Sequence, residues 1–136
     1  AEIEEKPTSP KLYNALASLY YQRGAYEEAI ASYEMVIGLA PNNVEALNNL
    51  AWLYATCPEE KYRNAEQALL YAQKAAKLRP DPHVLDTLAE SYYANGQFQR
   101  AVQVIEEAVE KDPPEKDYYQ RQMEKFEEAV KMERTG

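Results

Sequence analysis

The sequence predicts an all-α fold of about seven helices, in which antiparallel helix pairs stack on one another as an α-solenoid. Three observations lead to this prediction. Apolar residues recur with the period of an α-helix, and strand signals are absent. One pattern of large, small and aromatic residues occurs three times, as in proteins built from structural repeats. One helix pair of this size cannot bury its own apolar face, so neighbouring pairs must stack.

The repeated pattern has two halves. The first half is a large apolar residue followed by leucine, alanine and tyrosine at constant spacing, and it occupies residues 13–20, 47–54 and 85–92. The second half is an alanine followed by a proline twelve residues later, at Ala29 and Pro41, Ala68 and Pro80, and Ala101 and Pro113. Small residues at these joints let two helices approach closely. Each repeat therefore predicts one helical hairpin.

Residues that favour helix starts recur ahead of the apolar segments. Ser9 and Asp81 each precede a proline, an arrangement typical of an N-cap followed by proline in the first turn. Asn64 with Gln67 resembles a capping box.

Glycine and proline predict where the helices end. Gly24 and Gly96 lie between paired helices, where glycine can adopt the left-handed conformation that terminates a helix. The repeated prolines close the second helices, because proline cannot continue a helix. The expected helices are residues 10–23, 26–39, 43–56, 64–78, 82–95, 98–111 and 115–133.

This pattern resembles the tetratricopeptide repeat family, and the resemblance covers about residues 10–114. It implies a right-handed superhelix whose first helices line a concave groove. The expected organisation is a flexible tail (1–9) and one domain (10–136), with repeats at about 10–43, 44–81 and 82–115. The segment 50–58 and the later segment 85–89 resemble bacterial members of the family, in several of which the repeats belong to a larger, membrane-anchored protein.

Two segments depart from the plain repeat. Residues 56–63 contain a five-residue insertion, which is a tolerated surface loop, a recognition loop or a contact with a neighbouring domain. The last expected helix, 115–133, carries one apolar stripe at Tyr119, Met123, Phe126 and Val130. That stripe predicts a solvating helix that covers the last repeat. The alternative is a helix that packs on a partner or on a second copy of the chain.

The counts of reactive residues and the net charge exclude several classes of function. One cysteine cannot close an internal disulfide, and one histidine does not suffice for a multi-histidine metal centre. The formal charge of −8 argues against nucleic acid as a partner. Phosphate-binding and nucleophile motifs are absent, and adjacent carboxylates on a helix do not face one another. We therefore expect no catalytic residue, no cofactor and no metal site, and we predict that the protein is not an enzyme.

The family resemblance implies which residues line the groove, through their register in the repeats. The candidate peptide-binding residues are Asn14, Tyr21, Glu45, Asn48, Asn49, Trp52, Asp86, Glu90 and Tyr93. Asparagine can pair with the donor and the acceptor of a peptide backbone, and tryptophan and tyrosine are common interface anchors. The acidic members favour a basic or neutral extended segment. The alternative for the aromatic members is that they pack on neighbouring helices.

One known groove chemistry of the family is not expected. Its dicarboxylate clamp uses lysine, asparagine and arginine at set positions, which here are Asn14, Ser18, Asn49, His83 and Thr87. Only Asn49 matches, and a terminal carboxylate would lack its cations.

The prediction is therefore a non-enzymatic protein–protein interaction scaffold that binds a partner peptide or helix in the concave groove. The alternative is a structural or assembly module of a larger protein, which acts through self-association or intramolecular docking. A monomer or a weak homo-oligomer is expected. No apolar run is long enough to cross a membrane, so direct membrane contact is not expected for this fragment. The cytoplasm is the favoured compartment, with the periplasm or a membrane-anchored parent as alternatives.

Overall fold

The computed structural model describes residues 9–135, and these residues form seven α-helices and no strand. The helices are α1 (Pro10–Gln22), α2 (Tyr26–Leu39), α3 (Val44–Thr56), α4 (Ala65–Leu78), α5 (Pro82–Ala94), α6 (Phe98–Glu110) and α7 (Lys116–Thr135). Every helix end lies within two residues of its predicted position. Apart from Ser9, the predicted tail of residues 1–9 lies outside the described residues.

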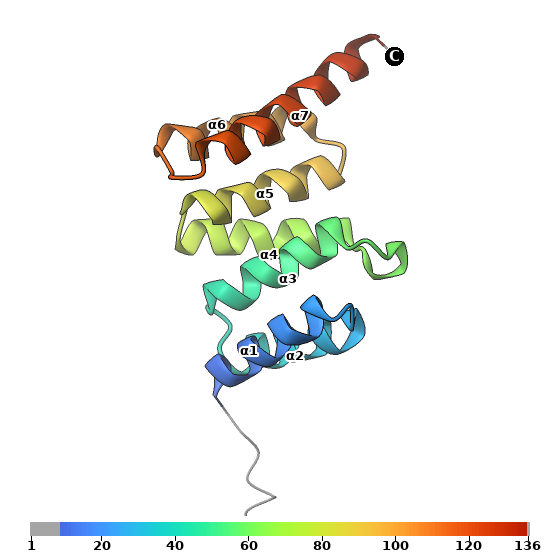
Figure 1. Ribbon diagram of the computed structural model, residues 1–136, viewed down its shortest axis with the longest axis vertical. Helices are drawn as coiled ribbons and strands as arrows, with labels where there is room; N and C mark the ends of the chain where they lie inside the picture. The colour runs from blue at the N-terminus through green and yellow to red at the C-terminus, as the bar shows by residue number, and fades with distance from the viewer. Residues whose placement is uncertain (1–8, 136) are drawn as a thin grey trace, which may run out of the picture.

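The helices stack as three hairpins followed by a single helix. Helices α1 and α2, α3 and α4, and α5 and α6 pack as pairs, and α1 and α7 lie at opposite ends of the stack (Figure 1). Each pair also packs on the next, through α2 with α3, α4 with α5 and α6 with α7. The predicted all-α solenoid is confirmed.

The helix starts follow the predicted capping residues with one difference. Ser9 Oγ accepts a hydrogen bond from the Leu12 amide at 3.3 Å, and Asn64 Oδ1 accepts one from the Gln67 amide at 3.2 Å. Asp81 occupies the N-cap position of α5, but its side chain makes no capping bond. Its carboxylate instead pairs with Arg79 Nε at 2.9 Å, because that cation lies only two residues away.

The turns inside the first and third hairpins require a left-handed backbone. Gly24 and Gly96 both have φ of 77°, a conformation in which a residue with a Cβ is strained. The prediction that glycine ends these helices is confirmed.

Small residues lie at the joints between helices. Fully buried alanines occur in every hairpin, at residues 17, 29, 46, 51, 68, 72, 75, 89, 101 and 108. One hydrophobic cluster runs from Ala51 of α3 to Phe126 of α7, so the core continues from the second repeat to the end of the stack. Tyr119 is 5% exposed and Phe126 is 0% exposed, so the apolar stripe of α7 covers the last repeat as predicted.

The inserted segment forms a short ordered link between α3 and α4. It contains a 3₁₀ turn at Glu60–Tyr62, and Arg63 Nε donates a hydrogen bond to the Cys57 carbonyl oxygen at 2.6 Å. Cys57 is fully buried, and the Tyr62 ring packs 6.0 Å from the Tyr26 ring. The insertion thus contacts the first hairpin and also positions Arg63.

Candidate functional site

Three neighbouring hollows lie on the face formed by α1, α3 and α5, and we call this side of the stack the hollowed face. Trp52 of α3 lines all three hollows. The α1 hollow has a volume of about 140 Å³ and is lined by Ser18, Tyr21, Tyr33, Asn49 and Trp52. The middle hollow, about 210 Å³, lies between α3 and α5 and is bordered by Tyr118 of α7. The large hollow, about 820 Å³, lies near the C-terminal ends of α3 and α5.

Trp52 occupies an unusual place for a large aromatic residue. It is half-buried and lies outside the hydrophobic clusters of the described residues, whereas Leu50 and Leu53 on the same helix are fully buried. Such a side chain offers apolar area and one N–H donor, the usual composition of an interface anchor. Its side chain therefore lines the hollows instead of joining a core cluster.

Asn48 borders the middle hollow with an unused acceptor. The residue is 8% exposed, and its Oδ1 accepts no hydrogen bond from the described residues. A buried acceptor without a donor costs roughly 1–3 kcal/mol. A peptide N–H that entered the middle hollow could supply this donor. Asn49 lies beside it and lines both the α1 hollow and the middle hollow.

The acidic side chains of α5 are covered by α7. Asp86 is 5% exposed and accepts hydrogen bonds from Tyr118 Oη at 2.6 Å and Gln122 Nε2 at 2.8 Å. Glu90 is 6% exposed and accepts hydrogen bonds from Gln122 Nε2 at 2.8 Å and Lys125 Nζ at 2.5 Å. The sequence predicts that the acidic residues, with Glu45, attract a basic or neutral segment. That expectation needs correction for Asp86 and Glu90, because α7 already supplies donors to their carboxylates.

This polar layer changes the acidity of its members. Burial raises the pKa of Asp86 because a low-dielectric environment disfavours the charged form, and the hydrogen bonds from Gln122 and Tyr118 offset part of that effect. Burial, together with the hydrogen bond to the Asp86 carboxylate, also raises the pKa of Tyr118. At neutral pH the Tyr118 hydroxyl therefore remains a donor.

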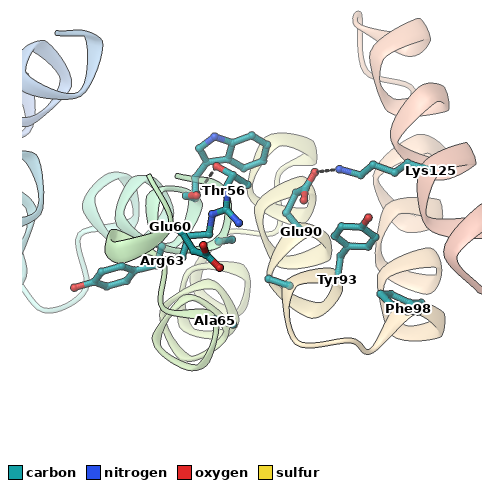
Figure 2. Close-up of a pocket in the computed structure, with 12 residues that line it drawn as sticks. Thr56, Glu60, Arg63, Ala65, Glu90, Tyr93, Phe98 and Lys125 are labelled. Carbon is teal, nitrogen blue, oxygen red and sulfur yellow. Dashed lines mark hydrogen bonds and ion pairs between the residues drawn. The ribbon is translucent and has the colours of Figure 1, made fainter. Parts of the chain in front are cut away.

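The large hollow lies between two walls, and each wall carries one acidic and one basic side chain (Figure 2). One wall includes Thr56, Glu60, Arg63 and Ala65, and the other includes Glu90, Tyr93, Phe98 and Lys125. Lys125 Nζ lies 4.8 Å from the centre of the Tyr93 ring, a cation–π contact that adds to its ion pair with Glu90. Two acidic and two basic groups thus border a surface of aromatic and alanine side chains.

The predicted site residues separate into groups. Tyr21, Asn48, Asn49, Trp52, Asp86, Glu90 and Tyr93 each line at least one of the three hollows. Asn14 and Glu45 line none of the three. Asn14 is 4% exposed and donates through Nδ2 to Asn43 Oδ1 at 3.2 Å, whereas Glu45 is exposed in the first turn of α3. Tyr93 also contacts the Phe98 and Phe126 rings, at 5.4 Å and 5.3 Å, so packing on neighbouring helices describes part of its role.

Sequence reasoning missed the residues that come from the insertion and from α7. Arg63, Tyr118, Gln122 and Lys125 all reach the hollowed face or the carboxylates beneath it. Their register relative to the repeats is not given by the repeated pattern. The position of the large hollow could have been predicted from the sequence, because Ala55 occupies the repeat position that holds Tyr21 and Tyr93 in the other hairpins.

Two family models match the chain. The model described as TPR repeat matches residues 17–56, and the model described as Tetratricopeptide repeat matches residues 82–124. Together the matches span more than half of the chain. The chain belongs to the tetratricopeptide repeat family. No curated protein matches it. Tetratricopeptide repeats generally mediate protein–protein interaction, and we take this general role as the starting point for the chain.

Two further findings concern other kinds of site in this tetratricopeptide array. Within residues 9–135, no three or more histidine, cysteine, aspartate or glutamate side chains are grouped so that they could hold a metal ion. In the same range, no helix combines the length and the apolar character that are needed to cross a membrane.

Proposed function

We propose that this protein is a non-enzymatic scaffold that binds a partner peptide or helix along the hollowed face. One observation carries the proposal: the only tryptophan of the chain lies outside the core and lines three adjacent hollows. A ligand that follows this face would contact Trp52 wherever it binds. Asn48 and Asn49 would pair with its backbone, and Tyr21 and Tyr93 would contact its side chains.

The charges favour a partner segment that is neutral or carries few basic residues. The carboxylates of Asp86 and Glu90 already accept hydrogen bonds from α7, so they offer little attraction to an incoming cation. Glu45 and Glu60 are exposed and remain available to a basic residue of the partner.

The test uses fluorescein-labelled peptides selected against the protein from a random 12-residue library. We expect Trp52→Ala or Asn49→Ala to weaken their binding, by about tenfold or more for Trp52→Ala because it removes a central anchor. Fluorescence anisotropy measures the affinity. The helical circular dichroism and the melting temperature should stay nearly unchanged.

The matched control is Leu70→Ala on α4, an exposed apolar residue that does not line the three hollows of the hollowed face. It should leave peptide affinity at the wild-type value. Equal affinity of wild type and Trp52→Ala would contradict the proposal. Collapse of the Trp52→Ala fold would identify Trp52 as a core residue instead.

A second candidate function is assembly through the α1 end of the stack. Leu12 and Leu19 of α1 are 41% and 49% exposed. The corresponding residues of α3, Ala46 and Leu53, are fully buried because a preceding hairpin covers them. The α7 stripe is not available for this role, since it is packed inside the chain. The occupant we assign to α1 is a second copy of the chain, packed through its own α1.

Light scattering over a range of protein concentrations tests this assembly. The double variant Leu12→Gln with Leu19→Gln should lower the average mass at high concentration. The control is Leu70→Gln with Leu78→Gln, which removes two exposed leucines from α4. A mass equal to one chain at every concentration for the wild type would exclude self-association.

A further inference from the structure

An aromatic pair packs at the turn of the first and third hairpins. In each case the penultimate residue of the first helix contacts the first residue of the second helix. Tyr21 packs on Tyr26 with ring centres 5.6 Å apart, and Tyr93 packs on Phe98 with ring centres 5.4 Å apart. Aromatic pairs at such distances stabilise a joint beyond the area they bury.

The second hairpin lacks this pair. Its penultimate and first residues at the same two places are Ala55 and Ala65. Both alanines line the large hollow. The hollow is therefore located where the other two hairpins carry two aromatic rings.

The insertion does not replace the missing rings. Its aromatic residue, Tyr62, packs instead on Tyr26 of the first hairpin, at 6.0 Å between ring centres. Glu60 and Arg63 of the same segment border the hollow and leave it open. Arg63 is held by its hydrogen bond to the Cys57 carbonyl oxygen, so its guanidinium is positioned at the edge of the hollow.

Aromatic surfaces of the protein flank the vacant place on two sides. Trp52 lies about one helical turn before Ala55, and Tyr93 and Phe98 belong to the opposite wall (Figure 2). A ring placed between these walls would make offset or edge contacts with aromatic faces on both sides. The volume, about 820 Å³, lies within the roughly 300–1,000 Å³ range of clefts that hold small ligands.

The charges around the hollow select against a charged guest. Glu60 and Glu90 carry two negative charges, and Arg63 and Lys125 carry two positive charges. The formal charges cancel, and Lys125 is already paired with Glu90. A charged guest would lose hydration without gaining net attraction, whereas a neutral ring buries apolar area.

We propose that the large hollow takes a tyrosine or phenylalanine side chain of the partner peptide, which places one aromatic ring where the second hairpin lacks the pair. The inference rests on the proposed function, because it names the residue that anchors the partner on the hollowed face. Arg63 would donate to the backbone carbonyl or the phenol oxygen next to the ring.

The first test uses small analogues of single side chains: p-cresol for tyrosine, n-propylguanidinium for arginine and propionate for glutamate. The single Trp52 gives one indole N–H signal in a proton–nitrogen correlation spectrum. We expect p-cresol to shift this signal saturably and the two charged analogues to shift it weakly. A stronger response to n-propylguanidinium or propionate would overturn the inference.

The second test fills the hollow from within. Ala55→Tyr restores one ring of the missing pair and should weaken p-cresol binding by about tenfold, as expected for blocking one anchor contact. Ala65→Phe fills the same place from the other helix and serves if the first variant does not fold. The matched control is Ala31→Tyr on the exposed side of α2, which should bind p-cresol as the wild type does. Unchanged binding to both hollow-filling variants would overturn the inference.

The same variants separate this inference from the proposed function. Library peptides that lose affinity with Trp52→Ala but not with Ala55→Tyr would support binding along the hollowed face and contradict the aromatic anchor. Binding of p-cresol that is blocked by Ala55→Tyr, with no peptide selected from the library, would support the hollow and contradict the peptide-binding function. Peptides enriched in tyrosine or phenylalanine and blocked by both variants would support both.

Discussion

The environment of Asp86 differs from the one that its place in the repeat predicts. On the isolated helix it is an exposed carboxylate of the groove, but in the folded chain it lies under Tyr118 and Gln122. Its raised pKa means that the folded state binds the proton more tightly than the unfolded chain does. Stability from this group is present below the unfolded pKa and is lost as the pH rises through the folded pKa.

We therefore predict that Asp86→Asn changes the pH dependence of stability. At pH 7 the free energy of unfolding of the variant should lie within about 1 kcal/mol of the wild-type value, because asparagine keeps an acceptor for Tyr118 and removes a buried charge. As the pH falls towards 4, the stability of the wild type should rise relative to that of the variant, by up to about 1.4 kcal/mol per pH unit. Urea unfolding at several pH values measures the difference.

The control for this experiment is Asp117→Asn, which changes an exposed carboxylate of α7. It should show no comparable gain of the wild type at low pH. A constant difference between wild type and Asp86→Asn from pH 7 to pH 4 would contradict the assigned environment of Asp86.

At the residue scale, the repeated pattern predicted which side chains share a face of a helix, but not what covers that face. Trp52 and Asn49 line hollows because their register places them there. Asp86 and Glu90 have the same kind of register, yet α7 covers them. The contact depends on where Gln122 falls on a helix that does not match a full repeat, so the pattern carried no information about it.

The helices and turns, by contrast, follow from local chemistry. Proline and glycine define the ends of the hairpins, so the boundaries could be predicted within two residues. The insertion is the element whose structure could not be predicted. Its contact with Tyr26 and the anchoring of Arg63 depend on distances between elements rather than on a local signal.

Replacement of glycine by alanine should have opposite effects on stability at a turn and inside a helix. Gly96→Ala should destabilise the fold by about 1–2 kcal/mol, because alanine is strained at φ of 77°. Gly38→Ala lies within α2 and should stabilise it by about 0.5–1 kcal/mol, because alanine is the better helix former. Beyond the neighbouring residues and the helix's own backbone, no heavy atom of the described residues lies within 4 Å of the added Cβ at either position, so a clash contributes to neither. Urea unfolding measures both, and two changes of the same sign would contradict the assigned backbone conformations.

Helix α7 should contribute strongly to stability despite its charged surface. Phe126 is fully buried in the cluster that reaches α3, so Phe126→Ala should cost about 3–5 kcal/mol. Met132→Ala on the same helix, where the side chain is 64% exposed, should change stability by less than about 0.5 kcal/mol. Chemical unfolding measures both variants.

Removal of the whole helix tests the same point more severely. A chain that ends after Pro114 would leave Asp86 and Glu90 without the donors from α7 and would expose the buried Ile105 region. We expect it to lose solubility or cooperative unfolding. A soluble, folded monomer without α7 would contradict the solvating role.

At the scale of the whole molecule, the two ends of the stack differ. At the α7 end, a buried aromatic stripe and a polar layer join the last helix to α5 and α6. At the α1 end, Leu12 and Leu19 remain partly exposed, and α1 packs mainly on α2. In a repeat protein each unit is stabilised by its neighbours, so the end with fewer contacts should open first.

Native-state hydrogen exchange can measure this difference. We predict that amides of α1 and α2 exchange faster than those of α5 and α6. Val36→Ala should accelerate them further, because Val36 is fully buried where α2 meets α3 and the change removes two methyl groups worth roughly 1.5–2 kcal/mol. That loss corresponds to about a tenfold to thirtyfold faster exchange of α1 and α2.

The matched variant Val84→Ala, at a fully buried site of α5 beside α3 and α4, should instead accelerate exchange in the central helices. If both variants accelerated exchange equally in every helix, the prediction would be wrong and the array would open as one cooperative unit. A local opening of α1 and α2 leaves the exchange of α6 and α7 unchanged, because those helices stay folded.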